Sequence, residues 1–203
     1  MKPGPMQRRT LLQAVASVAA GAGRMSAQDS SQVHHHAVQT AAKNGGQYKP
    51  HLFNAHEFKT VRMLADLVIP PEGPEPGGAG AGAAEFIDLL AANNDKLKEI
   101  WLGGLGWLDH ESRRRGGHNF VDATPEIRSG ILDDISYRKN ATPELAPGIH
   151  FFNWARRMVV DAYFTSPAGA KALGFMGNTG MSEFKVPKAS LDYALAKSPF
   201  KQA

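Results

Sequence analysis

The chain has 203 residues, no cysteine and a formal net charge of +4 at pH 7. Without cysteine it can form no disulfide, no thiolate-bound iron–sulfur cluster, no CxxCH haem attachment and no cysteine nucleophile. The excess positive charge comes from four basic residues near the start, Lys2, Arg8, Arg9 and Arg24. The remainder therefore carries no basic stripe of the kind that nucleic-acid binding needs.

Residues 1–27 are expected to form a twin-arginine export signal. Arg8 and Arg9 precede an apolar run over residues 11–22 that is too short to span a bilayer, which takes about 20 apolar residues. An ordinary secretory signal is the alternative. The twin-arginine route carries proteins that have already folded, often with a cofactor. The expected partner in export is therefore the twin-arginine translocase, and the expected location is the periplasm, free or associated with the inner membrane. Ala27 is the candidate last residue of the signal.

Residues 28–52 are mostly polar and contain a Gly-Gly pair, a composition typical of a flexible linker. The segment also holds three adjacent histidines, residues 34–36. Adjacent histidines on a flexible segment cannot form a preorganised metal site, so these side chains are expected to be solvated.

The first helix of the body is predicted to begin after Asn54, which forms a capping-box pattern with Glu57. Apolar residues then recur at helical spacing up to Val68, before two prolines end the helix. Residues 70–83 are rich in Pro and Gly but lack the preceding strand and the lysine of a phosphate-binding loop, so a structural loop is predicted. Asp66, alone in an apolar run, is expected to be solvated or to bond the amides of that loop.

Further helices are predicted over residues 84–92 and 95–115. Gly103 and Gly104 lie within the second of these, where they would kink it or allow another backbone to approach closely. Its basic end, residues 113–115, complements the negative helix C-terminus. A phosphate-binding site is the alternative interpretation of these three arginines.

The remaining helices are predicted after Thr124-Pro125, over residues 147–165, and after Ser166-Pro167, the last of them ending at Gly174. Residues 147–165 are the richest in aromatic side chains, and these cover more than one face of the helix. Such a helix is either central to the core or partly covered by another chain.

The whole pattern predicts an all-α fold, a compact bundle of about five or six helices with Pro/Gly-rich connections. The helical domain is expected over residues 53–180. The tail, residues 181–203, is expected to wrap over the body or a partner.

No catalytic, cofactor-binding or metal-binding residue is predicted in this chain. It has no HExxH helix, no GxSxG elbow and no GxGxxG after a strand. Two alternatives remain open: an exported protein that binds a small ligand between its helices, and a metal-dependent enzyme. The metal-dependent alternative would use histidines that fall on separate predicted elements, namely His56, His110, His118 and His150.

Three segments carry a resemblance to a known family: LADLVIPPEGPEPGGAGAGAAEFIDLL (64–90), LGWLDHESRRRGGHNFVDAT (105–124) and FTSPAGAKALGFMGNT (164–179). With them, the region from about 53 to 178 resembles the gluconate 2-dehydrogenase subunit 3 family, the small or gamma subunit of a membrane-associated dehydrogenase. The resemblance implies a large partner of the glucose–methanol–choline (GMC) flavoprotein type, which holds FAD and oxidises a sugar, sugar acid or glycoside.

The resemblance also implies that a cytochrome c often takes the electrons onward. The small subunit's twin-arginine signal would export the folded pair, and the small subunit would help the large one to mature. The family offers no catalytic residue of this subunit to carry over. The interface with the large subunit is expected near the aromatic helix and the segment after it, with Phe164, Phe175 and Met176 as candidate contacts.

Overall fold

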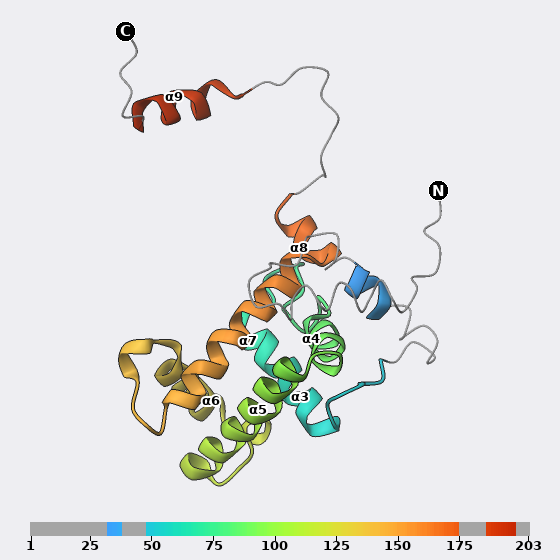
Figure 1. Cartoon of the computed structure of the whole chain (residues 1–203), viewed down its shortest axis with the longest axis vertical. Coiled ribbons are helices and arrows are strands. Elements are labelled where there is room, and N and C mark those ends of the chain that lie inside the picture. Colours follow the sequence, from blue (N-terminus) through green and yellow to red (C-terminus); the bar gives the residue numbers. More distant parts are fainter. Residues whose placement is uncertain (1–31, 38–47, 175–185, 198–203) are drawn as a thin grey trace.

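The computed structural model describes residues 32–37, 48–174 and 186–197. Within these ranges every regular element is a helix and no strand is present, which confirms the all-α prediction (Figure 1). One isolated bridge there pairs Glu72 with Glu75 in the loop between the first two long helices. The expected signal peptide, with Arg8 and Arg9, lies outside the described residues.

The predicted helices agree with the observed boundaries to within one or two residues, and the structure adds helical residues 32–37, two 3₁₀ helices and a helix near the C-terminus. From residue 55 onward the helices are α3 (Ala55–Val68), α4 (Ala83–Ala92), α5 (Asp95–Gly116), α6 (Pro125–Ser136), α7 (Ala146–Phe164), α8 (Pro167–Ala172) and α9 (Lys188–Lys197), with the 3₁₀ helices η1 (Phe120–Asp122) and η2 (Arg138–Asn140).

Local caps explain why these helices begin where the sequence predicts. The Asn54 side chain accepts from the Glu57 backbone N–H at 2.9 Å, and the Glu57 carboxylate accepts from the Asn54 N–H at 2.8 Å. Both hydrogen bonds of the capping box are therefore present. At α6 and α8 only the first of these bonds is present: the Thr124 and Ser166 hydroxyls accept from the Ile127 and Gly169 backbone N–H groups, and each cap is followed by proline in the first turn.

Helix α7 is the central element of the body. It packs against α3, α4, α5, α6 and α8, and Figure 1 shows it running through the middle of the bundle. On α5, Trp101 is fully buried with its ring edge-on to Phe151 of α7 at a centroid distance of 5.3 Å. The Trp101 indole N–H also points at the Met158 sulfur, 3.2 Å away. The central position predicted for this aromatic helix is therefore confirmed, and its partial coverage by another chain stays a prediction.

Gly104 of α5 makes room for α7. A Cβ at this position would lie 2.0 Å from Phe151 Cδ2, far inside van der Waals contact. At Gly103 a Cβ would meet nothing within 4 Å. The predicted close approach is therefore real at Gly104, and an aromatic ring rather than backbone fills the space.

The loop between α3 and α4 is tied down by Asp66. Its Oδ1 accepts from the Ala79 backbone N–H at 2.8 Å, which is the loop tether that the sequence suggested. The loop also lies tightly against α3, because a Cβ on Gly78 would come within 2.5 Å of the Ala65 carbonyl oxygen. Glycines at these positions let the loop fold back over the helix end.

Residues 32–37 are helical, and the expectation that the histidines there are solvated is wrong for His34. Its side chain is only 7 % exposed, stacks on Phe86 of α4 at 4.9 Å and donates from Nε2 to the Ala162 carbonyl of α7 at 2.8 Å. Val33 beside it is fully buried. The sequence pattern missed this because the partners lie 52 and 128 positions further along the chain.

The predicted linker also ends too late, because residues 48–53 are held by a buried carboxylate. Asp88 of α4 is 0 % exposed and accepts four hydrogen bonds of 2.7–3.0 Å. The donors are the Tyr48 hydroxyl and the backbone N–H groups of His51, Leu52 and Phe53. These bonds satisfy an otherwise costly buried charge and fix the chain just before α3.

Helix α9 was not predicted, since Ser166-Pro167 was expected to begin the last helix. It has a low amphipathic character, and none of its residues is buried. In Figure 1 it lies apart from the bundle. Whether the tail wraps a partner stays a prediction. Among the described helices, none has both the length and the apolar character to cross a membrane.

Candidate functional site

One face of α7 remains open although the helix is central. Side chains at a spacing of three or four residues form this face, which we call the α7 strip; it consists of His150, Asn153, Trp154, Arg157, Asp161 and Phe164. Each of them is exposed or half-buried, whereas the opposite face, with residues such as Phe151, Ala155 and Val159, is in the core. The strip therefore offers aromatic and charged groups to solvent on a rigid support.

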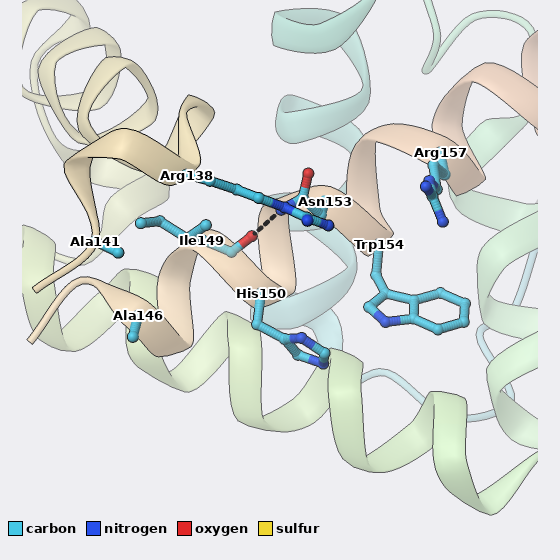
Figure 2. Close-up of a pocket in the computed structure, with 8 residues that line it drawn as sticks. All are labelled: Arg138, Ala141, Ala146, Ile149, His150, Asn153, Trp154 and Arg157. Carbon is cyan, nitrogen blue, oxygen red and sulfur yellow. Dashed lines mark hydrogen bonds between the residues drawn. The ribbon is translucent and has the colours of Figure 1, made fainter. Parts of the chain in front are cut away.

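A pocket of about 400 Å³ lies where the strip begins, between η2 and the first half of α7. Figure 2 shows His150, Asn153 and Trp154 along α7, with Arg138 extending from η2 toward Asn153. The other lining residues are Ala141, Ala146, Ile149 and Arg157. Ile149 is the one lining residue in the core, and five are exposed, so the pocket is a hollow in the surface and not an enclosed cavity.

The pocket combines a basic rim with an apolar floor. Two arginines and a histidine belong to its lining, and none of its lining residues is acidic. Ile149 belongs to the hydrophobic core, and the partly buried Trp154 packs against it. Lys96 of α5 adds a further cation, its Nζ lying 6.0 Å from the centroid of the Trp154 ring. Tryptophan and arginine together are the residue types most enriched among the energetically dominant contacts of protein interfaces.

The residues predicted to contact a partner subunit lie in sequence at or after the C-terminal end of the α7 strip. Phe164 closes α7 and is 42 % exposed, with its ring edge-on to the buried Tyr163 at 5.2 Å. Phe175 and Met176 lie outside the described residues. Leu173, just after α8, is 63 % exposed. Large apolar side chains thus reach solvent in the region where the interface is expected.

His56 and Asp109 form the closest arrangement to a catalytic pair. His56 Nε2 donates to Asp109 Oδ2 at 2.6 Å, and Asp109 Oδ1 accepts from the Phe120 backbone N–H at 2.9 Å. A catalytic dyad of this type also needs a nucleophile or a substrate oxygen within reach of the imidazole. Here the pair joins α3, α5 and η1, which gives it a structural role in the bundle.

The histidines of the metal-dependent alternative do not converge within the described residues. His110 and His118 are exposed, His150 lines the pocket, and His56 pairs with Asp109. Across the described residues no three His, Asp or Glu side chains come close enough together to hold a metal ion.

A second charged cluster supports the end of α5. Glu111, almost fully buried, accepts from Arg114 at 2.6 and 2.8 Å and from Arg115 at 2.7 Å. Hydrogen bonding from Arg114 is the main cause that lowers the pKa of Glu111, and Arg115 adds to it. Arg115 also reaches Asp134 of α6 at 2.9 Å. Arg113 bonds the Asn119 side chain at 2.6 Å. All three arginines at this helix end therefore have partners within the bundle, which favours a structural role over a phosphate site.

Sequence reasoning missed the pocket. The spacing of His150, Trp154 and Arg157 could have indicated an exposed helix face, but the prediction for this helix rested on its aromatic residues and named none of these three. Arg138 belongs to η2, twelve or more residues earlier, and nothing in the local pattern places it beside α7.

Comparison with known proteins gives one match. The family model described as gluconate 2-dehydrogenase subunit 3 matches residues 55–181, which is more than half of the chain. No curated protein matches the chain, and no solved structure does. The matched range includes α3 to α8, and with them the α7 strip and the pocket.

Proposed function

This chain belongs to the gluconate 2-dehydrogenase subunit 3 family, and from that premise we propose that it is the non-catalytic small subunit of a sugar-oxidising complex. Its partner is a large GMC-type flavoprotein that holds FAD and oxidises a sugar, sugar acid or glycoside. A cytochrome c subunit accepts the electrons in such complexes. The small subunit binds the large one, stabilises it and accompanies it out of the cytoplasm.

The α7 strip is the observation that carries this proposal. A chain that acted alone would gain by covering Trp154 and Phe164, yet both reach solvent on a helix whose other faces are in the core. Exposed aromatic and arginine side chains on a rigid support are typical of a surface that another protein covers. A stable complex of this kind buries at least about 1,200 Å² in total, and a strip along most of a 19-residue helix offers a surface of the required length.

The export proposal rests on residues 1–27. Arg8 and Arg9 form the twin-arginine signal, and the translocase recognises it while the flavoprotein is already folded around its FAD. The complex then resides in the periplasm or at the periplasmic face of the inner membrane. One signal on the small subunit thereby serves both chains, which explains why a chain without a predicted cofactor site carries it.

Affinity purification of the tagged chain from its native host tests the proposal. We expect a larger subunit to co-purify in a fixed ratio, with the absorbance spectrum of bound flavin and with dye-linked oxidation of a sugar or sugar acid. Replacing Arg8 and Arg9 by lysine should leave both subunits in the cytoplasm. A chain that purifies alone, colourless and monodisperse, would overturn the proposal and favour a stand-alone binding protein.

A further inference from the structure

The arginines of the described residues divide into two groups. Five have partners within the bundle: Arg62, Arg113, Arg114, Arg115 and Arg128 bond carboxylate, amide or carbonyl oxygens. The other three form no hydrogen bond or ion pair with any described residue. They are Arg138, Arg156 and Arg157, and two of them, Arg138 and Arg157, line the pocket at the start of the α7 strip.

This concentration is specific to the pocket. An exposed arginine in water needs no partner, but here two guanidinium groups from separate elements, η2 and α7, line one hollow without an acidic side chain among its walls. His150 also lines the pocket, and the Lys96 ammonium, 6.0 Å from the centroid of the Trp154 ring, adds positive charge nearby. Arginine is the residue best suited to bind carboxylates in a planar, two-hydrogen-bond geometry.

The floor of the pocket narrows the class of ligand. Ile149 and Trp154 give it an apolar base, and the Trp154 ring is only half-buried. A small free anion would leave the apolar surface of Ile149 and Trp154 exposed to water. A peptide segment can place carboxylates on the two arginines and an apolar side chain on that surface. The pocket also continues directly into the α7 strip, so an occupant of the pocket and an occupant of the strip would be neighbours.

We propose that the pocket is the docking point for an acidic segment of the large partner subunit, with carboxylates on Arg138 and Arg157 and an apolar side chain against Trp154. The inference rests on the proposed accessory function and adds the chemistry of the contact to it. Charge pairing at the rim accelerates and orients docking, and the covered tryptophan slows dissociation.

Charge reversal in the complex tests this inference. The variant is Arg138→Glu with Arg157→Glu, and the matched control is Lys49→Glu with Lys59→Glu, which makes the same change in charge at exposed residues outside the pocket. The tagged chain is purified with its large subunit, and the dissociation constant is measured at low and high salt. We expect the pocket variant to bind about tenfold or more weakly at low salt, and its binding to lose most of the salt dependence seen with the unaltered chain.

A cross-linking experiment identifies the occupant directly. In the Arg157→Lys variant, a carbodiimide joins the new amine to any carboxylate in contact with it, and mass spectrometry identifies the partner peptide. A cross-link to an aspartate or glutamate of the large subunit supports the inference. Cross-links elsewhere, together with unaltered binding of the double charge-reversal variant, overturn it while leaving the accessory function intact. If the unaltered chain forms no complex with a flavoprotein, the proposed function fails, and this inference fails with it.

Discussion

At the scale of single residues, Asp88 has the largest expected effect on stability. Its carboxylate is fully buried and satisfied by four donors, one of them the Tyr48 hydroxyl. Burial is the main cause that raises the pKa of Tyr48, and the charge of Asp88 adds to it, so the phenol stays protonated and keeps donating. The Tyr48 hydroxyl is therefore a donor to Asp88 over the whole physiological pH range.

Asp88→Asn should destabilise the chain by about 2–4 kcal/mol, because the amide NH₂ of asparagine would face N–H donors that need an acceptor. Urea unfolding followed by circular dichroism measures the change. The control is Asp122→Asn, at a side chain that is 56 % exposed and 3.7 Å from Lys59, where the change should stay within about 0.5 kcal/mol. Equal effects at the two positions would contradict the role assigned to Asp88.

Two adjacent glycines of α5 give opposite predictions. Gly104→Ala should cost about 1–3 kcal/mol, because the new methyl group would collide with the Phe151 ring. Gly103→Ala should stabilise by about 0.5–1 kcal/mol, since it removes backbone freedom from the unfolded chain and meets no atom within 4 Å. The melting temperature of each variant measures these effects. Shifts of the same sign in both variants would contradict the packing of Phe151 against Gly104.

At the scale of elements, the helix over residues 32–37 depends on a neutral histidine. Desolvation by burial is the main cause that lowers the pKa of His34 below its ordinary 6.5, and its hydrogen bond to Ala162 offsets this only in part. In the unfolded chain the same imidazole binds a proton near its ordinary pKa. The unfolded state therefore binds more protons as the pH falls through 6.5, and the folded state loses stability there.

The contribution of His34 to stability should thus be complete above about pH 7 and decline below pH 6.5. We expect the melting temperature to fall between pH 7.5 and pH 5.5, and His34→Gln to flatten part of that slope. The exposed His118 supplies the control, because His118→Gln should leave the slope as it is. A profile for His34→Gln that is parallel to that of the unaltered chain would contradict this account.

The elements also show which parts of the structure the sequence could predict. Helices α3 to α8 begin and end at caps, prolines and glycines that lie within a few residues of one another, so local rules predicted their boundaries. The sequence predicted a close approach near Gly104, but it did not predict that the Phe151 ring would be the approaching group. Helix α9 has little amphipathic character, and periodicity therefore gave no sign of it.

At the scale of the whole molecule, the contacts that join distant segments could not be predicted. Asp88 reaches back 40 residues to Tyr48, His34 reaches forward 128 residues to Ala162, and the pocket needs η2 to lie beside α7. A lone acid in an apolar run looks the same in the sequence whether it is half-buried and tethers a loop, as Asp66 does, or is fully buried and fixes residues 48–53, as Asp88 does. Only the tertiary fold separates these cases.

The folded unit extends further upstream than the family match, which begins at residue 55. A chain that begins at residue 48 keeps all the donors to Asp88 and the buried Phe53, whose ring lies 6.1 Å from Trp101. One that begins at residue 55 loses them and leaves a buried carboxylate without partners. We expect the first to fold cooperatively and the second to aggregate or unfold at a markedly lower temperature. Similar melting curves for the two would show that residues 48–54 are dispensable.

The docked residues 32–37 would also limit where the proposed export signal can be processed. Four residues lie between Ala27 and Gln32, so the proposed cut after Ala27 would lie at most about 17 Å from Gln32, whatever path the chain takes. If the proposed signal is cut after Ala27, a signal peptidase would have to work close to a bundle that already holds Val33 and His34 in its core. Cleavage and the docking of residues 32–37 would then compete for the same short stretch of chain, and we expect variants that loosen this helix to lose the leader faster.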